Sequence, residues 1–290
     1  MTHVENEIAS QPDCWREVLQ LRPQGLPRSG ERVAVIGCGT SLFMAQAYAG
    51  LREAAGQGET DAFAASEFPF GRRYDRVVAL TRSGTTTEVL AALNRIDTPT
   101  LAVTADPKTP VMQAADEVVV LEFADEQSVV QTRFATTALL LLRSGLGEDL
   151  SALPDQAQQA IDTPLPEGYE SRSQYTFLGT GWAVGIANEA ALKMREAAGA
   201  WTESYPAMEY RHGPFSITDE KSLVWTFGAV PDGLPDEIRR TGAQLVLGRR
   251  LDPIAELIGA QRLAIAVATA KGNDPDHPRN LSRSVILTGQ

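Results

Sequence analysis

Short apolar runs alternate along the chain with glycine- or hydroxyl-rich loops and with longer mixed stretches. The runs have five to seven residues, and their unbroken apolar character is typical of strands buried on both faces of a parallel sheet. The mixed stretches are long enough for helices that return over the sheet. We predict strands at 32–37, 76–80, 101–105, 117–123, 175–181, 222–228 and 243–248.

The helices expected between these strands lie at 42–55, 89–96, 129–142, 188–198, 235–240 and 254–270. Strand, loop and helix therefore repeat in the same order in both halves of the chain. This order is typical of an α/β fold. The predicted architecture is two tandem doubly wound parallel sheets of the flavodoxin-like kind.

Composition suggests where the two repeats begin and end. We predict an N-terminal helical segment at 1–30, a first domain at 31–145, a linker at 146–170, a second domain at 171–270 and a tail at 271–290. The linker carries several Pro, Gly and Asp residues around a short polar helix. The tail is too rich in turn-forming residues to belong to a sheet, and we expect it to close over the site.

Net charge limits the partners expected for this protein, and cysteine content indicates its compartment. The 290 residues include 26 Lys and Arg against 37 Asp and Glu, a net charge of −11, so we expect neither a nucleic-acid nor a membrane partner. Two cysteines, Cys14 and Cys38, and no recognisable signal peptide indicate a reduced, cytoplasmic setting. Three scattered histidines show no metal-ligand spacing, so neither a metal nor a cofactor is expected.

Two loops that follow predicted strands carry groups suited to an anion. GCGTS at 37–41 offers glycines and hydroxyls, and TRSGTTTE at 81–88 offers four hydroxyls beside Arg82. Loops at the carboxyl ends of parallel strands commonly bind phosphate. The alternative is that Ser83 or Thr87 only caps the following helix.

A dinucleotide site is a second interpretation of the first loop. Gly37 and Gly39 follow a strand, and Glu59 or Asp61 lies at a suitable distance for a ribose contact. However, Leu42 stands at the third glycine position, and the second hydroxyl loop is then unexplained. A phosphate held by both loops fits better.

The segment 188–214 carries the candidate acid–base groups. Glu189, Lys193 and Glu196 are spaced i, i+4 and i+7, which places them on one face of a helix. His212 lies in the stiff turn RHGP that follows. These residue types can move protons in sugar chemistry. The alternatives are a surface salt-bridge ladder and a plain loop histidine.

Taken in order, these motifs resemble the sugar isomerase (SIS) domain family, in particular the isomerase half of glucosamine-6-phosphate synthase. The resemblance covers nearly the whole chain. It rests on HVENEIASQP at 3–12, CGTS at 38–41, TRSGTTTE at 81–88, EQSVVQTRFATT at 126–137, EAALKMRE at 189–196, RHGP at 211–214 and KGNDPDHPRNLSRSV at 271–285.

The resemblance implies a role for each matched position. The residues matched to the 6-phosphate site are Ser41, Thr81, Arg82, Ser83 and Thr86. Val129 matches a backbone contact to the sugar. Glu196 matches the base that moves a proton between C1 and C2, with Glu189 and Lys193 as its neighbours. His212 matches a ring-opening histidine donated by the partner subunit, which implies a homodimer with shared sites.

This sequence departs from the synthase pattern in three ways. It has no counterpart of the glutamine-hydrolysing domain, so we expect no ammonia to be released from glutamine. Arg82 replaces a glutamine at the phosphate. Arg283 replaces a C-terminal lysine that forms a Schiff base with the ketose, and a guanidinium cannot form one.

We therefore expect an enzyme acting on a phosphorylated amino sugar, glucosamine 6-phosphate or N-acetylglucosamine 6-phosphate. Abstraction of the C2 proton by Glu196 would give aldose–ketose isomerisation or deamination. One alternative is a dehydratase that eliminates the C3 hydroxyl of an N-acetylhexosamine 6-phosphate, which Arg283 favours. Another is a sugar-phosphate sensor without catalysis.

Overall fold

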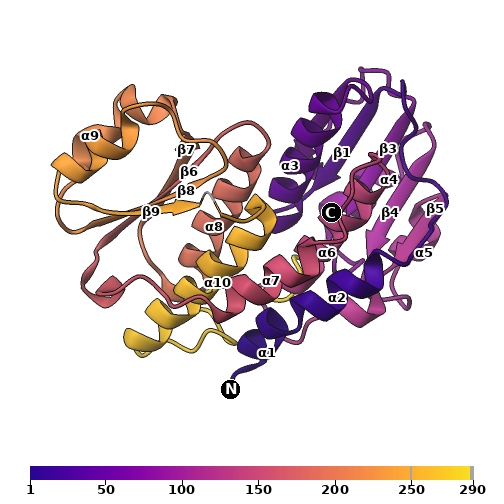
Figure 1. Cartoon of the computed structure of the whole chain (residues 1–290). Helices are drawn as coiled ribbons and strands as arrows, with labels where there is room; N and C mark the ends of the chain where they lie inside the picture. Colours follow the sequence, from indigo (N-terminus) through magenta and orange to yellow (C-terminus); the bar gives the residue numbers. More distant parts are fainter. Residues whose placement is uncertain (249, 288–290) are drawn as a thin grey trace. The chain divides into compact units, whose positions relative to one another are not determined.

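The computed structural model describes residues 1–248 and 250–287. The chain forms two compact units, each built on one parallel sheet (Figure 1). The first-sheet unit comprises Asp13–Gln127, Gln131–Ser151 and the tail from Ser282. The second-sheet unit comprises Met1–Pro12, Ser128–Val130 and Ala152–Leu281. The predicted α/β class with two parallel sheets is confirmed.

The first sheet has five parallel strands in the order β2-β1-β3-β4-β5. Their bounds are β1 Val33–Gly37, β2 Thr60–Ala64, β3 Arg76–Leu80, β4 Thr100–Thr104 and β5 Glu117–Val120. All residues of β1, β3 and β4 are buried, as the unbroken apolar runs predict. Strand β2 was missed because its sequence, TDAFA, is half-exposed and not continuously apolar.

Helices cover both faces of this sheet. Helix α3 (Thr40–Ala54) packs on β1 and on α6 (Arg133–Ser144). On the other face, α4 (Thr87–Leu93) and α5 (Val111–Ala114) close an apolar core that includes Ile36, Val77 and Val89. This packing leaves the carboxyl ends of the strands as the edge from which the two predicted loops emerge.

The second sheet repeats the topology with one strand fewer, β7-β6-β8-β9. Its strands are β6 Gln174–Gly179, β7 Thr202–Pro206, β8 Ser222–Phe227 and β9 Gln244–Gly248. Helix α8 (Ala183–Ala198) packs on β6 and on α10 (Pro253–Ala270), and α9 (Leu234–Arg240) covers the opposite face. Strand β7, TESYP, was missed for the same reason as β2.

One sequence-based boundary needs correction. The helix expected from residue 129 begins at Arg133, because the Glu126 carboxylate accepts the backbone N–H groups of Thr132 and Arg133 and so fixes the first turn there. In the segment 146–170, predicted as a linker around a short polar helix, that helix is α7 (Leu153–Asp162), which packs on α10. The N-terminal segment forms α1 (His3–Ala9) and α2 (Gln11–Val18).

Helix α10 is the one described helix that is long and apolar enough to cross a membrane. Two thirds of it, 67%, are buried inside the protein, as in the central helix of a core. Its apolar character is therefore explained by packing on α7 and α8.

Candidate active site

The second hydroxyl loop links β3 to α4 in the first-sheet unit. Its hydroxyls face one another: Ser83 Oγ lies 3.4 Å from Thr86 Oγ1 and accepts the backbone N–H of Thr85 at 3.3 Å. Gly84 has φ 62°, and a Cβ there would overlap the hydroxyl of Thr109, so the turn requires glycine. Sequence and backbone together hold several hydroxyl groups at the end of one strand.

These hydroxyls do not cap the helix. Thr86 is the N-cap residue of α4, yet its side chain forms no capping hydrogen bond. The capping interpretation of Ser83 or Thr87 is wrong: Ser83 binds within the loop, and Thr87 Oγ1 accepts from Leu287. The buried Thr81 hydroxyl has no hydrogen-bond partner among the described residues. A buried hydroxyl without a partner is costly unless a ligand satisfies it.

The chain tail returns to this loop. Ser284 Oγ lies 2.9 Å from Thr85 Oγ1 and 3.2 Å from Ser83 Oγ. The carbonyl of Val285 accepts the N–H of Thr87 at 3.2 Å. The tail therefore adds a hydroxyl to the set that the loop already presents.

Arg82, which the resemblance matches to the phosphate site, points into the protein. Its side chain is fully buried, and its Nη1 lies 3.8 Å from Glu126 Oε2, which is also fully buried. Its Nη2 donates to the carbonyl of Arg283 at 2.8 Å. In this structure Arg82 joins the loop to the tail, and its charge faces a carboxylate.

Arg283, which the resemblance matches to a Schiff-base lysine, is anchored at the protein surface. Its Nη2 lies 2.6 Å from Asp125 Oδ1, and its Nη1 donates to the carbonyl of Glu126. This is the carboxylate pairing expected of a structural arginine. Its main contribution in this geometry is to hold the tail against residues 125–126.

Ser41 lies in the first turn of α3 and is buried. Its N–H donates to the carbonyl of Cys38, and Gly39 before it has φ 55°. The acidic residues of the dinucleotide interpretation are engaged elsewhere: Glu59 pairs with Arg32 at 3.0 Å, and Asp61 accepts from a tyrosine hydroxyl at 2.6 Å. The geometry favours the phosphate interpretation.

The acidic and basic stripe lies on α8 in the second-sheet unit. Lys193 Nζ lies 3.5 Å from Glu189 Oε1 and also pairs with Glu196. The side chains of Glu189 and Lys193 are buried, whereas that of Glu196 is 21% exposed. The three residues share one face, as their spacing predicts, and the surface-ladder interpretation is wrong. Of the two carboxylates that flank the buried lysine, only Glu196 is accessible to solvent.

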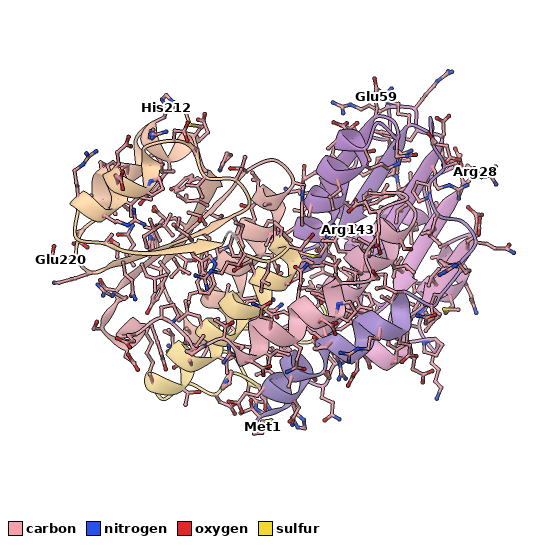
Figure 2. All side chains as sticks on the ribbon, viewed as in Figure 1. Met1, Arg28, Glu59, Arg143, His212 and Glu220 are labelled. Carbon is pink, nitrogen blue, oxygen red and sulfur yellow. The ribbon has the colours of Figure 1, made fainter. Side chains whose placement is uncertain are left out.

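His212 lies on an anchored surface loop of the same unit (Figure 2). The neighbouring Arg211 binds Glu237 through two nitrogens, each at 2.9 Å, and donates to the carbonyl of Asp232. Gly213 follows with φ 125°. The imidazole is exposed and forms no hydrogen bond with any residue that the structure describes. The fold therefore presents this histidine outward.

Val129 lies in the loop 128–130, held by a buried carboxylate from α1. Glu7 accepts the N–H of Ser128 at 3.2 Å and contacts its hydroxyl. Ser128 Oγ also donates to the carbonyl of Val130 at 2.8 Å. Val129 therefore sits between two fixed residues.

No protein-family model matches the chain. Curated relatives with the name glutamine–fructose-6-phosphate aminotransferase (isomerizing) do match. The protein of Pyrobaculum aerophilum is 28% identical over 73% of this chain and 44% of its own length. That of Escherichia coli O157:H7 is 26% identical over 98% of this chain and 59% of its own length. The chain thus spans about half the length of these relatives.

These matches are consistent with the sugar isomerase (SIS) family that the motifs resemble. Solved structures share the fold of this chain. Glucosamine-6-phosphate deaminase of Thermotoga maritima has a TM-score of 0.85 at 22% identity, covering 99% of this chain and all of that one. Tagatose-6-phosphate ketose/aldose isomerase of Escherichia coli has a TM-score of 0.76 at 21% identity, covering 96% and 97%.

Three residues support the site but were not singled out from the sequence. They are Glu7, Glu126 and Ser284. A carboxylate shortly before a helix is a weak signal for Glu126, since it can bind the first N–H groups. Nothing local marks Glu7 or Ser284, because their partners lie 121 and about 200 residues away.

Proposed function

We propose that this protein is an amino-sugar-phosphate isomerase or deaminase that acts on a hexosamine 6-phosphate. The observation that carries the proposal is the stripe on α8, in which the buried Lys193 pairs with the partly exposed Glu196. A partly exposed carboxylate held in position by a buried lysine is suited to act as a general base. The hydroxyl loops supply the groups expected for the phosphate.

In the proposed reaction, the Glu196 carboxylate removes the C2 proton of the open-chain sugar. The C–H electron pair becomes the C1=C2 double bond, and the C1 carbonyl accepts a proton to give an enolamine. Return of the proton to C1 gives the 2-imine, which water hydrolyses to the ketose and ammonia. His212, donated by the partner subunit, opens the ring beforehand by moving a proton from the C1 hydroxyl to the ring oxygen.

The phosphate is proposed to bind Ser41 and the hydroxyls of the loop 81–86. The buried Thr81 hydroxyl and the mutually facing Ser83 and Thr86 support this assignment. Hydrogen bonds to a charged phosphate are stronger than those between neutral groups. Arg82 would act at longer range, because its guanidinium faces Glu126.

One observation favours a dehydratase as the second candidate. Arg283 cannot form a Schiff base, and its guanidinium is held by Asp125. Without a covalent ketimine, an intermediate with an acetamide at C2 can expel the C3 hydroxyl as water. That path needs only a base, a proton donor and oxyanion support.

The test is to incubate the protein separately with glucosamine 6-phosphate and N-acetylglucosamine 6-phosphate in D2O. Mass spectrometry would follow deuterium at C1 and C2, ammonia release and loss of water. Ammonia with deuterium exchange from the free amine supports the first proposal, and dehydration of the acetamide supports the second. Tight binding without exchange would mean a sensor. The same incubations with Glu196→Gln test the proposed base. Glu220→Gln, a change at an exposed position, is the matched control for that variant.

A further inference from the structure

Comparison of the two sheets shows that one strand position differs. In the first sheet, β4 is flanked by β5, with Leu101 to Thr104 paired to Glu117 to Val120. In the second sheet the equivalent strand, β9, is the last in the order. Only residues 249–252 separate β9 from α10. The second unit therefore ends in an open parallel edge where the first has a fifth strand.

A cavity of about 570 Å³ runs along this edge. One wall is β9 itself, from Gln244 to Leu247. The opposite walls are the segment 163–166 and the face of α10 that carries Gly259 and Arg262. The edge is thus a groove of limited width, which suits one extended chain better than a second flat sheet.

The floor of the groove contains polar atoms that lack partners. The indole of Trp225 is 5% exposed, and its Nε1–H is buried without an acceptor among the described residues. Gln244 Oε1 is likewise buried without a donor, while its Nε2 donates to the carbonyl of Glu167. Buried polar groups are normally hydrogen-bonded. A peptide group supplies both the acceptor and the donor that these two atoms require.

The groove is also cationic in a protein of net charge −11. Arg250 and Arg262 both line it, and neither guanidinium forms an ion pair within the part of the chain that the structure describes. Arg262 Nη1 is fixed by the carbonyls of Ala160 and Thr163, at 2.9 and 2.6 Å. Among the described residues that line the groove, Glu256 is the only one with a carboxylate, and burial raises its pKa, which disfavours its charged form.

We propose that the outer edge of β9 binds an extended, acidic segment of a partner polypeptide, which adds to the sheet as a fifth strand. Main-chain hydrogen bonds to β9 would supply affinity, and Arg250 and Arg262 would select an acidic side chain. The first sheet of the same chain contains an acidic edge strand of this kind, paired with an arginine. In the first unit, β5 reads EVVV, and Glu117 lies 3.6 Å from Arg76. The bound segment would be about five residues long, the length of β9.

The experiment uses a synthetic peptide with the sequence of Asp116–Leu121 (DEVVVL), labelled with a fluorophore and titrated with the full chain. We expect saturable binding in fluorescence anisotropy. Two further peptides carry N-methyl groups on alternate amides. If the peptide adds as a strand, one methylated form should lose binding at least tenfold, while the other keeps it. Equal effects of the two forms would overturn strand addition.

Variants of the protein locate the site and test the charge. Val246→Lys should weaken binding at least tenfold, whereas Glu220→Lys, on an exposed position outside the groove, should not. Arg262→Gln should weaken binding of DEVVVL several-fold but leave NQVVVL unchanged. Absence of binding, or binding indifferent to Val246→Lys, would overturn the proposal. So would a change in oligomeric mass with Val246→Lys, since a second copy would then occupy the edge.

Discussion

At the residue scale, burial separates the members of the α8 stripe. Glu189 and Lys193 are almost fully buried, and Glu196 is the member that solvent can reach. A surface ion pair of this spacing contributes little, but removing one partner of a buried pair leaves a charge without compensation. Stability and catalysis should therefore depend on different members of the same stripe.

Lys193→Met is expected to lower the free energy of unfolding by about 3 kcal/mol, because Glu189 stays buried without its cation. Glu196→Gln should lower it by less than about 1 kcal/mol. Urea denaturation followed by circular dichroism measures both. A similar small effect for the two variants would show that Glu189 is compensated by other groups.

Glu196→Gln should reduce turnover roughly 10²–10⁴-fold, the usual contribution of a general base. Affinity for the sugar phosphate should stay nearly unchanged, since the proposed phosphate contacts lie on other elements. Steady-state kinetics and calorimetric titration separate the two quantities. A loss of activity below about tenfold would remove Glu196 from the role.

Cys14 should resist alkylation in the folded protein. Burial raises the pKa of its thiol to about 11, and its Sγ lies 3.6 Å from the carbonyl of Phe123. The folded-state pKa is raised, so at pH 8 only about one thousandth of the thiol is ionised, and reactivity should grow as the pH rises. Iodoacetamide labelling with peptide mapping at pH 8 and pH 10 tests this. Rapid labelling of native protein at pH 8 would contradict it.

At the element scale, the strands and helices with strong patterns were predictable and those without were not. Strands β1, β3 and β4 are buried along their whole length, so their apolar runs identified them. Strands β2 and β7 are half-exposed, and nothing in their composition marks them. The start of α6 depends on the carboxylate of Glu126, a contact outside the helix, so periodicity alone placed it four residues early.

The parts of the candidate site that could be predicted are those whose residues lie within one short segment of the sequence. The stripe on α8 and the hydroxyl loop after β3 each lie within one short segment. By contrast, the orientation of Arg82 depends on Glu126 and on the tail carbonyl of residue 283. No pattern within the loop encodes that arrangement, so the sequence predicted only that Arg82 belongs to the phosphate site.

The hydroxyl loop should make phosphate the main determinant of binding. Glucosamine 6-phosphate should bind at least about 100-fold more tightly than glucosamine, because the charge-assisted hydrogen bonds are lost with the phosphate. Isothermal titration of the Glu196→Gln variant measures both affinities without turnover. Comparable affinities would mean that the loop 81–86 does not hold phosphate.

At the scale of the whole molecule, the family resemblance leads to a prediction about shared sites. His212 is exposed on an anchored loop, and its imidazole forms no hydrogen bond with the described residues. If His212 acts in the partner subunit, a mixed dimer of His212→Ala and Glu196→Gln subunits contains one site with both changes and one with neither.

His212→Ala and Glu196→Gln should each be nearly inactive when expressed alone. Co-expression of the two variants should restore a measurable fraction of wild-type activity. Purification through two different affinity tags isolates the mixed dimer for assay. Inactive mixed dimers would show that His212 and Glu196 act within one subunit. Co-expression of Glu196→Gln with itself under the two tags is the matched control.

The return of the tail to the first sheet also bears on how the protein is made. Ser284 meets Ser83 and Thr85 across 199–201 positions of sequence, after the chain has passed through the whole second sheet. During translation, the loop 81–87 leaves the ribosome long before its last hydroxyl and the anchoring Arg283 exist. Any product that stops before residue 282 lacks these contacts. The set of hydroxyl groups at the loop is therefore complete only in chains that have been translated past Ser284.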